Sequence, residues 1–242
     1  MSLLDLELEQ HHGFPNRNIV GIDEVGRGCI AGPVVAAAVW LPKGAFFSES
    51  EKAVCLKPEW SWLSGVRDSK KMTETEREHA FAAAESSGLH WAPGLASVAE
   101  IDELNILWAS MLAMERAQKA LEEKVGVRTL KDACLLVDGN RVPKGLSERG
   151  VAIVKGDARS LAIACASVLA KVTRDRMMDH YGTEWVGYGL ETHKGYPTPQ
   201  HLKALDQHGV LEIHRKTFGP VKSRLLAQDV QKRGSHERKN TL

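Results

Sequence analysis

The chain has 242 residues, with 32 lysines and arginines against 31 aspartates and glutamates and a formal net charge of +1. This balance is that of an ordinary globular protein and argues against a strongly basic protein that coats nucleic acid. The apolar runs AGPVVAAAVWLP and SLAIACASVLA fall short of the roughly 18 residues that span a bilayer, and the N-terminus lacks the basic region of a secretory signal. We therefore expect no secretory signal and no membrane insertion.

The cysteines show no C-x-x-C pair and no spacing typical of a metal finger; they are Cys29, Cys55, Cys134 and Cys165. Cys134 lies in an apolar run and Cys165 in an alanine-rich stretch, which favours buried and unreactive thiols. Reduced cysteines suit the cytoplasm, where we expect the protein to act.

The N-terminal part is predicted to contain an arm, a pair of strands and a surface excursion. Residues 1–17 are polar and contain a glycine and a proline, so we expect a short flexible arm. Strands at 18–22 and 34–41 follow, joined by a glycine-rich turn as a hairpin or tight meander. Residues 42–68 are predicted to be a long irregular excursion.

The rest of the chain alternates between strands and helices. A capping box, Thr73 to Glu76, begins one helix. On the next predicted helix, an apolar stripe that includes Trp108 and Met111 is expected to face the core. The order predicts a mixed α/β sheet in one main domain over 18–225, followed by a polar, disordered tail over 226–242. The further strands are expected at 89–98, 134–137 and 151–154, and the further helices at 100–121, 160–179 and 198–208.

The most specific local feature is GIDEVGRG at residues 21–28, in which an apolar strand ends in Asp23 and Glu24 before a Gly-Arg-Gly turn. The glycines match a loose dinucleotide fingerprint, G-x-G-x-x-A, beginning at Gly26. That fingerprint must open a helix that binds pyrophosphate, whereas a strand pattern follows here. We therefore reject a dinucleotide oxidoreductase. The other alternative is that the two acids are ordinary turn residues.

Further acids at the ends of predicted strands favour a functional site over plain turn chemistry. Asp138 ends one strand as Asp23 ends another, and Asp157 follows the next. Gathered at one edge of the sheet with Glu24, they would form an all-oxygen site suited to Mg²⁺ or Mn²⁺. Without a metal, four such carboxylates would repel one another and at least one would bind a proton.

One geometric condition accompanies this hypothesis. Adjacent side chains on a regular strand point to opposite faces, so Asp23 and Glu24 cannot both face one metal site from an unbroken strand. We therefore expect a break or a bulge in the strand at this point, helped by Gly26 and Gly28.

A second constellation is basic and polar. The segment DSKK at 68–71 precedes a helix start, where backbone N–H groups and lysines can hold a phosphate. A loop at 192–198 carries Tyr196 ahead of His201. Taken singly, a lysine is usually a solvated surface residue and such a tyrosine is as often half-buried packing. Around a carboxylate–metal site, however, cations indicate phosphodiester chemistry. The cations that flank Asp157 are Lys155, Arg159, Lys171 and Arg174.

At these residues the sequence resembles the bacterial ribonuclease HII family, the type 2 ribonucleases H. The matching blocks, in the family's order over roughly residues 18–222, are GIDEVGRGCIAGPV, DSKKMTETERE, LLVDGNRVP, VKGDARSLAIACASVLAKVTRDR and HKGYPTPQH. The resemblance implies a ribonuclease H-like fold, with a central mixed sheet flanked by helices and a helical C-terminal part. It also implies an endonuclease that cuts the RNA strand of RNA–DNA hybrids and cuts 5′ of single ribonucleotides in duplex DNA, leaving 3′-OH and 5′-phosphate ends. We expect a monomer.

Carried over to this chain, the resemblance implies metal ligands at Asp23, Glu24 and Asp138, with Asp157 as the fourth acidic catalytic residue and metal ligand. Mn²⁺ or Mg²⁺ is the implied cofactor in a two-metal mechanism. The Gly-Arg-Gly turn would contact the ribonucleotide 2′-OH through its backbone, and a tyrosine would pack against the sugar at the RNA–DNA junction. Two serine–lysine pairs would lie beside the nucleic-acid backbone. These substrate-binding positions are Gly26, Arg27, Gly28, Ser69, Lys70, Ser167, Lys171 and Tyr196.

The departures from the family pattern are small. Val25 and Cys29 stand where the family has alanine and proline, and residues 42–67 are longer than is usual. Two other function classes stay open. A non-catalytic nucleic-acid binder has no need of four acids, and an integrase-like or exonuclease-like nuclease would share the carboxylates without the Gly-Arg-Gly turn.

Overall fold

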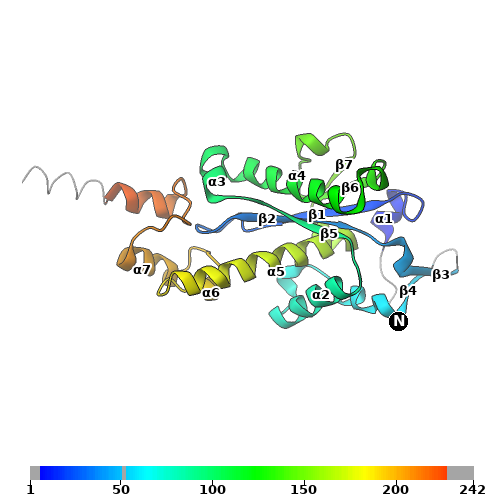
Figure 1. Cartoon of the computed structure of the whole chain (residues 1–242), viewed down its shortest axis with the longest axis horizontal. Helices are drawn as coiled ribbons and strands as arrows, with labels where there is room; N and C mark the ends of the chain where they lie inside the picture. The colour runs from blue at the N-terminus through cyan, green and yellow to red at the C-terminus, as the bar shows by residue number, and fades with distance from the viewer. Residues whose placement is uncertain (1–5, 51–52, 228–242) are drawn as a thin grey trace, which may run out of the picture.

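The computed structural model describes residues 6–50 and 53–227 of the chain, and its centre is a five-stranded sheet (Figure 1). The strands are β1 (Ile19–Val25), β2 (Val34–Trp40), β5 (Trp91–Ala96), β6 (Cys134–Asp138) and β7 (Gly150–Ile153). They lie in the order β5-β2-β1-β6-β7. β2 is antiparallel to β1 and β5, whereas β6 is parallel to β1 and β7. The prediction of a mixed sheet is therefore confirmed.

Helices cover both faces of this sheet (Figure 1). α3 (Val98–Leu104) and α4 (Ile106–Val125) lie on one face, and α5 (Leu161–Glu184) lies on the other, with α2 (Glu74–Ser86) packed on α5. A glycine brings α5 close to the sheet, because a Cβ atom on Gly21 of β1 would lie 2.1 Å from the carbonyl carbon of Ala162. This close approach sets the position of α5 beside the end of β1.

The C-terminal part is helical, as expected. It contains α6 (Leu190–His193), α7 (Pro199–His208) and a helical segment that begins at residue 219. Pro199 stands at the first position of α7, where its missing N–H group is no loss. These helices pack on the end of α5 and on the turn between β1 and β2 through an apolar cluster that includes Ile30, Met178, Tyr188, Leu205 and Val221.

The N-terminal segment differs from the expected flexible arm. A short helix, α1 (Glu7–His11), lies against the main core, where Leu6 and Phe14 are buried. The buried Glu9 accepts hydrogen bonds from the Ser160 hydroxyl at 2.7 Å and the Ala162 N–H at 3.2 Å, at the start of α5. Residues 6–14 are therefore part of the packed domain. Two apolar anchors and a buried carboxylate hold them, which the polar composition concealed. The tail predicted to be disordered lies outside the described residues from position 228 onward.

The single helix predicted over 100–121 is two helices. Asn105 separates them with a φ of 69°, and its side chain caps α4 by accepting from the N–H groups of Leu107 and Trp108 at 3.0 and 3.4 Å. Trp108, in the first turn of α4, is 53% exposed, so its assignment to the core was wrong.

The excursion after β2 is more regular than predicted. It contains an antiparallel hairpin of β3 (Phe46–Ser50) and β4 (Ala53–Leu56), followed by a 3-10 helix, η2 (Pro58–Gly65), whose Leu63 is buried. The remaining 3-10 helices are η1 (Lys43–Ala45), η3 (Ser69–Lys71), η4 (Val127–Leu130), η5 (Lys144–Leu146) and η6 (Gly156–Ala158).

In the part of the chain that the structure describes, no helix has both the length and the apolar character to cross a membrane. Cys29, Cys134 and Cys165 are buried thiols as expected, while Cys55 is only half-buried. A strand, β2, follows the Gly-Arg-Gly turn, which confirms that the turn does not open a dinucleotide-binding helix.

Candidate active site

Two aspartates meet where the parallel strands β1 and β6 end. The last registered pair between these strands is Ile22 with Val137, and Asp23 and Asp138 are the next residues of each strand. Because the strands are parallel and in register, the two side chains fall on the same face of the sheet, the face covered by α5. The predicted convergence of these two acids at one sheet edge is confirmed.

The strand does not break at Asp23 and Glu24, so the expected bulge is wrong. β1 stays in continuous register with β2, with Asp23 opposite Ala37 and Glu24 opposite Ala36. The carboxylate of Glu24 is nevertheless close enough to Asp138 for their charges to interact.

Burial and mutual repulsion dominate the electrostatics of these acids. Burial, and then the charges of Glu24 and Asp138, raise the pKa of Asp23 well above its usual range, against a hydrogen bond from Ser167 of α5. Burial also raises the pKa of Glu24, although Arg27 opposes this through an ion pair of 3.1 Å. Burial raises the pKa of Asp138 as well, although the Gly156 N–H donates to its Oδ1 at 2.6 Å. Such a cluster of acids attracts cations.

The donor chemistry of the cluster fits a hard divalent metal ion, since every side-chain donor is a carboxylate oxygen. Among the described residues, however, no group of three or more His, Cys, Asp or Glu side chains stands in an arrangement ready to hold a metal ion. Two of the acids are turned to protein partners, Glu24 to Arg27 and Asp138 to the Gly156 amide. Asp23, Glu24 and Asp138 are the residues that would hold the ion.

The fourth predicted acid, Asp157, lies in η6 and faces a cation from another part of the chain. Lys70 Nζ is 3.5 Å from Asp157 Oδ2, and the lysine side chain is 82% exposed. Burial alone would lower the pKa of Lys70, but the charges of Asp157, Asp23 and Asp68 together raise it. Lys70 is therefore an exposed cation at the edge of the acidic cluster.

The other predicted backbone-binding residues are less accessible. Ser69 and Ser167 are buried, and their hydroxyls share a hydrogen bond of 2.9 Å that joins η3 to α5. Lys171 donates to Asp175 at 2.7 Å from a side chain that is 19% exposed. These three side chains are mostly buried, whereas Lys155 and Arg159 are exposed beside Asp157.

Arg174 does not flank the site as a phosphate-binding cation. It is fully buried on α5, and its guanidinium donates to the backbone carbonyls of Pro33, Ala31 and Lys194 at 2.8 to 2.9 Å. The prediction failed because a basic residue next to acids in the sequence resembles a surface cation. Here the arginine faces the turn between β1 and β2 instead.

A second buried arginine, Arg215, was missed by the sequence analysis. It is also fully buried, and it donates to the carbonyls of Gly26, Arg27 and Gly32 at 2.7, 3.1 and 3.0 Å. No pattern around Arg215 distinguishes it from a solvated arginine in a loop. Its role is visible only when the C-terminal part is folded onto the turn.

The Gly-Arg-Gly turn and Tyr196 lie side by side. Gly26 has a φ of +95°, and a Cβ atom there would lie 2.3 Å from Arg174 Nε, so only glycine fits. Gly28 is exposed, and a Cβ atom built on it would lie 3.6 Å from Tyr196 Cε1. Tyr196 is itself 40% exposed. The structure thus presents the bare backbone of Gly28 next to an aromatic ring.

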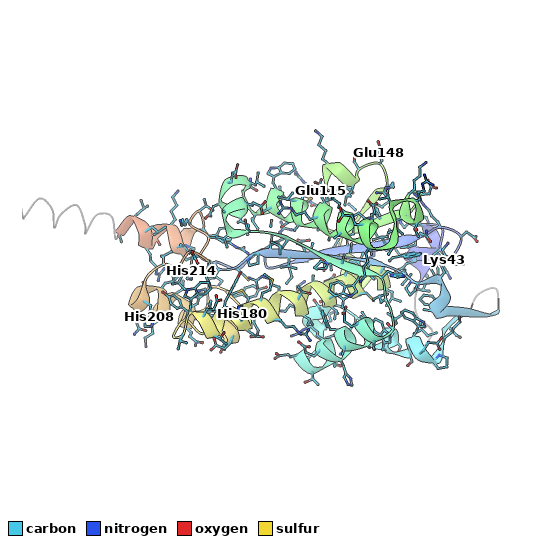
Figure 2. All side chains as sticks on the ribbon, in the orientation of Figure 1. Lys43, Glu115, Glu148, His180, His208 and His214 are labelled. Atoms are coloured by element: carbon cyan, nitrogen blue, oxygen red, sulfur yellow. The ribbon has the colours of Figure 1, made fainter. Side chains whose placement is uncertain are left out.

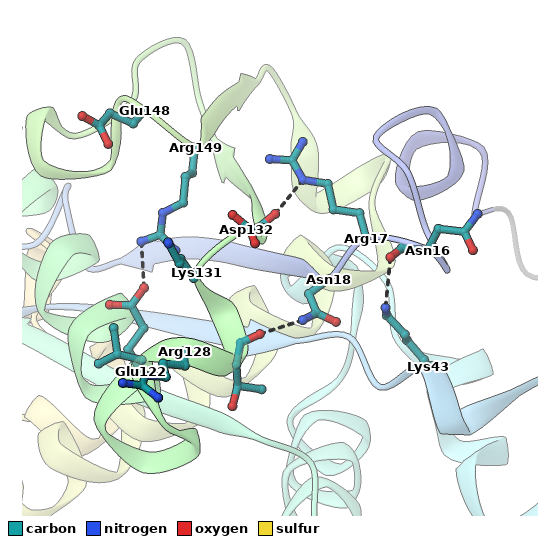
Figure 3. Close-up of a pocket in the computed structure, with 12 residues that line it drawn as sticks. Asn16, Arg17, Asn18, Lys43, Glu122, Arg128, Lys131, Asp132, Glu148 and Arg149 are labelled. Carbon is teal, nitrogen blue, oxygen red and sulfur yellow. Dashed lines mark hydrogen bonds and ion pairs between the residues drawn. The ribbon is translucent and has the colours of Figure 1, made fainter.

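A hollow of about 910 Å³ lies at the other end of β1, around Asn16, Arg17 and Asn18 (Figure 3). In this hollow Arg17 donates to the Asp132 carbonyl and Arg149 pairs with Glu122. It contains none of the predicted site residues. The predicted chemistry lies at the opposite, carboxyl end of the same strand.

Most of the chain is similar to one known protein family. The ribonuclease HII family model matches residues 20–221. The ribonuclease HII of Marinomonas sp. (strain MWYL1) is 46% identical over 204 residues, covering 84% of this chain and 91% of the relative.

Two solved structures share the fold at low sequence identity. Ribonuclease H2 from Pyrococcus horikoshii OT3 aligns with a TM-score of 0.57 at 23% identity, over 85% of this chain and 96% of that one. Bst-RNase HIII in complex with Mn²⁺ aligns with a TM-score of 0.65 at 18% identity, over 89% of this chain and 71% of that one. The ribonuclease H-like fold is therefore confirmed. The chain belongs to the ribonuclease HII family and is a ribonuclease H-type endonuclease.

Proposed function

We propose that the protein cuts the RNA strand of RNA–DNA hybrids and also cuts 5′ of a single ribonucleotide embedded in duplex DNA, leaving 3′-OH and 5′-phosphate ends. One observation carries this proposal, namely the juxtaposition of two features at one end of the sheet. The first is the buried acidic cluster of Asp23, Glu24 and Asp138, which has the chemistry to support phosphodiester cleavage. The second is the Gly-Arg-Gly turn, in which Arg27 and Gly28 are exposed, with Tyr196 beside Gly28; together they have the shape to recognise a ribose.

Members of this family depend on divalent metal ions, and two Mg²⁺ or Mn²⁺ ions would be held by Asp23, Glu24 and Asp138 with support from Asp157. When bound, such ions neutralise the phosphate and activate a water molecule. The chain's own residues prepare the site. The acids repel one another without a cation, and Lys70 adds an exposed positive charge at the edge of the cluster for the flanking phosphates.

Selection of ribonucleotides requires contact with the 2′-OH, because this group distinguishes RNA from DNA. The carbonyls of Gly26 and Arg27 already accept hydrogen bonds from the buried Arg215. Arg27 and Gly28 are exposed residues, and within the described chain their backbone N–H groups donate to no protein acceptor, so these groups are available to a sugar hydroxyl. Tyr196 then offers a flat face for the neighbouring deoxyribose.

The proposal is tested with a DNA duplex that contains one ribonucleotide, incubated with and without Mg²⁺ or Mn²⁺. We expect one cut, 5′ to the ribonucleotide, with a 3′-OH upstream and a 5′-phosphate on the ribonucleotide. The matched control is the same duplex with hydrogen in place of that 2′-OH, which should not be cut. Cleavage of the control would contradict recognition of the 2′-OH. Binding without metal-dependent cleavage would favour a non-catalytic nucleic-acid binder.

A further inference from the structure

Three buried histidines lie behind Tyr196 in the C-terminal part of the molecule. His193 is 7% exposed, and His201 and His214 are fully buried. The rings of His193 and His201 stack with their centroids 4.2 Å apart and an interplanar angle of 15°. Figure 2 places His214 in this C-terminal part, at the end of the molecule opposite Lys43.

The hydrogen bonds fix where the protons of His201 and His214 lie. The Leu211 N–H can only donate, so His214 Nδ1 accepts at 2.9 Å and the proton of a neutral His214 is on Nε2. The Tyr196 carbonyl can only accept, so His201 donates to it from Nδ1 at 2.9 Å. His201 Nε2 is then free of a proton and accepts from His214 Nε2 at 3.0 Å. One proton on each ring satisfies all three hydrogen bonds.

The neutral state that this chain of hydrogen bonds requires is also the one that the surroundings favour. Burial, together with the neighbouring imidazoles, lowers the pKa of both His201 and His214 to about 4. The remaining ionisable groups that face the two rings are His193, Tyr188 and Arg224, with His208 behind Tyr188. Both imidazoles are therefore neutral near pH 7.

His193 is hydrogen-bonded to Gly195, the residue that precedes Tyr196 in the same loop. Its Nδ1 accepts from the Gly195 N–H at 3.2 Å, and its Nε2 donates to the Tyr188 carbonyl at 2.8 Å. The two stacked imidazoles are thus hydrogen-bonded to successive residues of the loop, His193 to Gly195 and His201 to Tyr196. The loop in turn bonds to the β1–β2 turn, because the Gly195 carbonyl accepts from the Ile30 N–H at 2.9 Å.

The residue after His214 is Arg215, which holds the Gly-Arg-Gly turn. Its guanidinium donates to the carbonyls of Gly26 and Arg27, and its backbone N–H donates to the Ile30 carbonyl at 2.9 Å. The dipeptide His214–Arg215 therefore reaches in two directions. The His214 imidazole donates to His201, which donates to the Tyr196 carbonyl. The Arg215 guanidinium donates to carbonyls of the turn that faces the Tyr196 ring.

We propose that His201 and His214 form a hydrogen-bond relay, continued by Arg215, that positions Tyr196 against the Gly-Arg-Gly turn and so contributes to the selection of single ribonucleotides. This inference rests on the proposed function of Tyr196. The two histidines are positioning residues, since neither ring is exposed to substrate. The relay fixes the spacing between the two elements that would contact the ribose and its neighbour.

The relay itself is tested without substrate by NMR of the full chain labelled with ¹⁵N in histidine. We expect His214 as the Nε2–H tautomer and His201 as the Nδ1–H tautomer near pH 7, with neither ring titrating between pH 5 and 8. The opposite tautomer of either ring, or titration near the ordinary value of 6.5, would overturn the relay. This result does not depend on what Tyr196 does.

The role of the relay in ribonucleotide selection is tested with two variants of His201, each of which can keep one of its two hydrogen bonds. His201→Asn places an amide N–H near the Nδ1 position and can keep the bond to the Tyr196 carbonyl, whereas His201→Gln can keep only the bond to His214. We expect His201→Gln to lower kcat/KM on a single-ribonucleotide duplex about three- to tenfold relative to a continuous hybrid, the effect of one positioned hydrogen bond. For His201→Asn, the ratio of kcat/KM on the single-ribonucleotide duplex to kcat/KM on the continuous hybrid should stay closer to that of the wild type. The exposed His79, on α2, supplies the control variant His79→Gln, which should leave the ratio of the two kcat/KM values unchanged.

The coupling to Tyr196 is tested in a double variant. Tyr196→Ala should already lower the single-ribonucleotide to hybrid ratio, and adding His201→Gln should lower it no further. A second, additive fall in the ratio would overturn the relay's action through Tyr196, as would equal losses on both substrates for His201→Gln. If Tyr196→Ala alone left the ratio unchanged, the proposed function of Tyr196 would fail, while the NMR result would still decide whether the relay exists.

Discussion

Asp138 lies beside Asp23, each one residue beyond the last registered pair of the parallel strands β6 and β1. The relationship depends on register, because a shift of one residue would turn one of the two carboxylates to the opposite face of the sheet. The packing that fixes the register of β1, including the contact of Gly21 with α5, therefore also fixes the acidic cluster.

We predict that Asp138→Asn folds normally and loses cleavage by more than about 100-fold, beyond the roughly 10- to 100-fold typical of residues that only support a metal ligand. The amide is nearly the same size as the carboxylate but carries no charge to attract a divalent cation. Initial rates on a hybrid at saturating Mg²⁺ measure the loss, and thermal unfolding checks the fold. Activity within tenfold of wild type would remove Asp138 from the metal site. Asp157→Asn, near the exposed Lys70, should keep more activity.

A second prediction concerns stability without metal. Burial and the charges of Glu24 and Asp138 raise the pKa of Asp23 above its ordinary value of 3.8. The folded protein then binds this proton more tightly than the unfolded chain, so the free energy of unfolding falls as pH rises from 3.8 through the raised pKa. Asp23→Asn should reduce this decline and raise the free energy of unfolding at pH 8. Urea unfolding in EDTA across pH 4 to 8 measures it, and added Mg²⁺ should stabilise wild type more than the variant. An identical pH dependence in both proteins would contradict it.

Much of the fold could be predicted because its signals are local. The capping box at Thr73 does begin α2, and Thr198 with Pro199 does begin α7. The alternation of strands and helices correctly indicated a mixed sheet. Asp23 and Asp138 were predicted to lie together because strand ends meet at one end of a sheet, and the register of β1 and β6 does place them side by side.

The parts that were missed depend on contacts between distant segments. The bulge was expected at Glu24 because adjacent side chains of a strand point to opposite faces, whereas the pairing with β2 keeps β1 regular through Val25. Arg174 and Arg215 are buried because backbone carbonyls accept their hydrogen bonds, those of the β1–β2 turn for both residues and that of Lys194 for Arg174 as well. Carbonyl acceptors are common to every residue, so no side-chain pattern in the sequence indicates them.

The third prediction contrasts two glycines of the same turn. Gly26→Ala forces a positive φ on alanine and places its Cβ atom against Arg174, so it should destabilise the fold by about 1–3 kcal/mol. Gly28→Ala meets only the Tyr196 ring at ordinary contact distance and should fold normally. Its methyl group should nevertheless reduce cleavage of the single-ribonucleotide duplex, because it occupies the surface proposed for the sugar. Thermal unfolding and kcat/KM separate the two effects. Equal stability of the two variants would contradict the strain at Gly26.

The fourth prediction concerns the exposed cation at the site. Lys70→Ala should weaken binding to hybrids and to mixed duplexes by similar factors and should lower the salt slope of binding by about one unit. A phosphate contact carries no information about the sugar, which is why both substrates should respond alike. The matched control is Lys119→Ala, an exposed lysine of α4 that faces Glu123. Lys171→Ala should have the smaller effect because its ammonium is paired with Asp175. A changed ribonucleotide preference with an intact slope would contradict phosphate binding by Lys70.

The last prediction separates junction recognition from support of the fold. Tyr196 is partly exposed and faces Gly28, so its ring can serve as a flat surface for a deoxyribose next to the ribonucleotide. Tyr196→Ala should lower kcat/KM on a single-ribonucleotide duplex by at least about tenfold, the scale of losing an aromatic platform. A continuous hybrid should suffer less, because the enzyme can use several registers along it. Tyr196→Phe should fall in between, since the ring remains and only the hydroxyl is lost. Equal losses on both substrates for Tyr196→Ala would mean that the tyrosine supports the loop and does not recognise the junction.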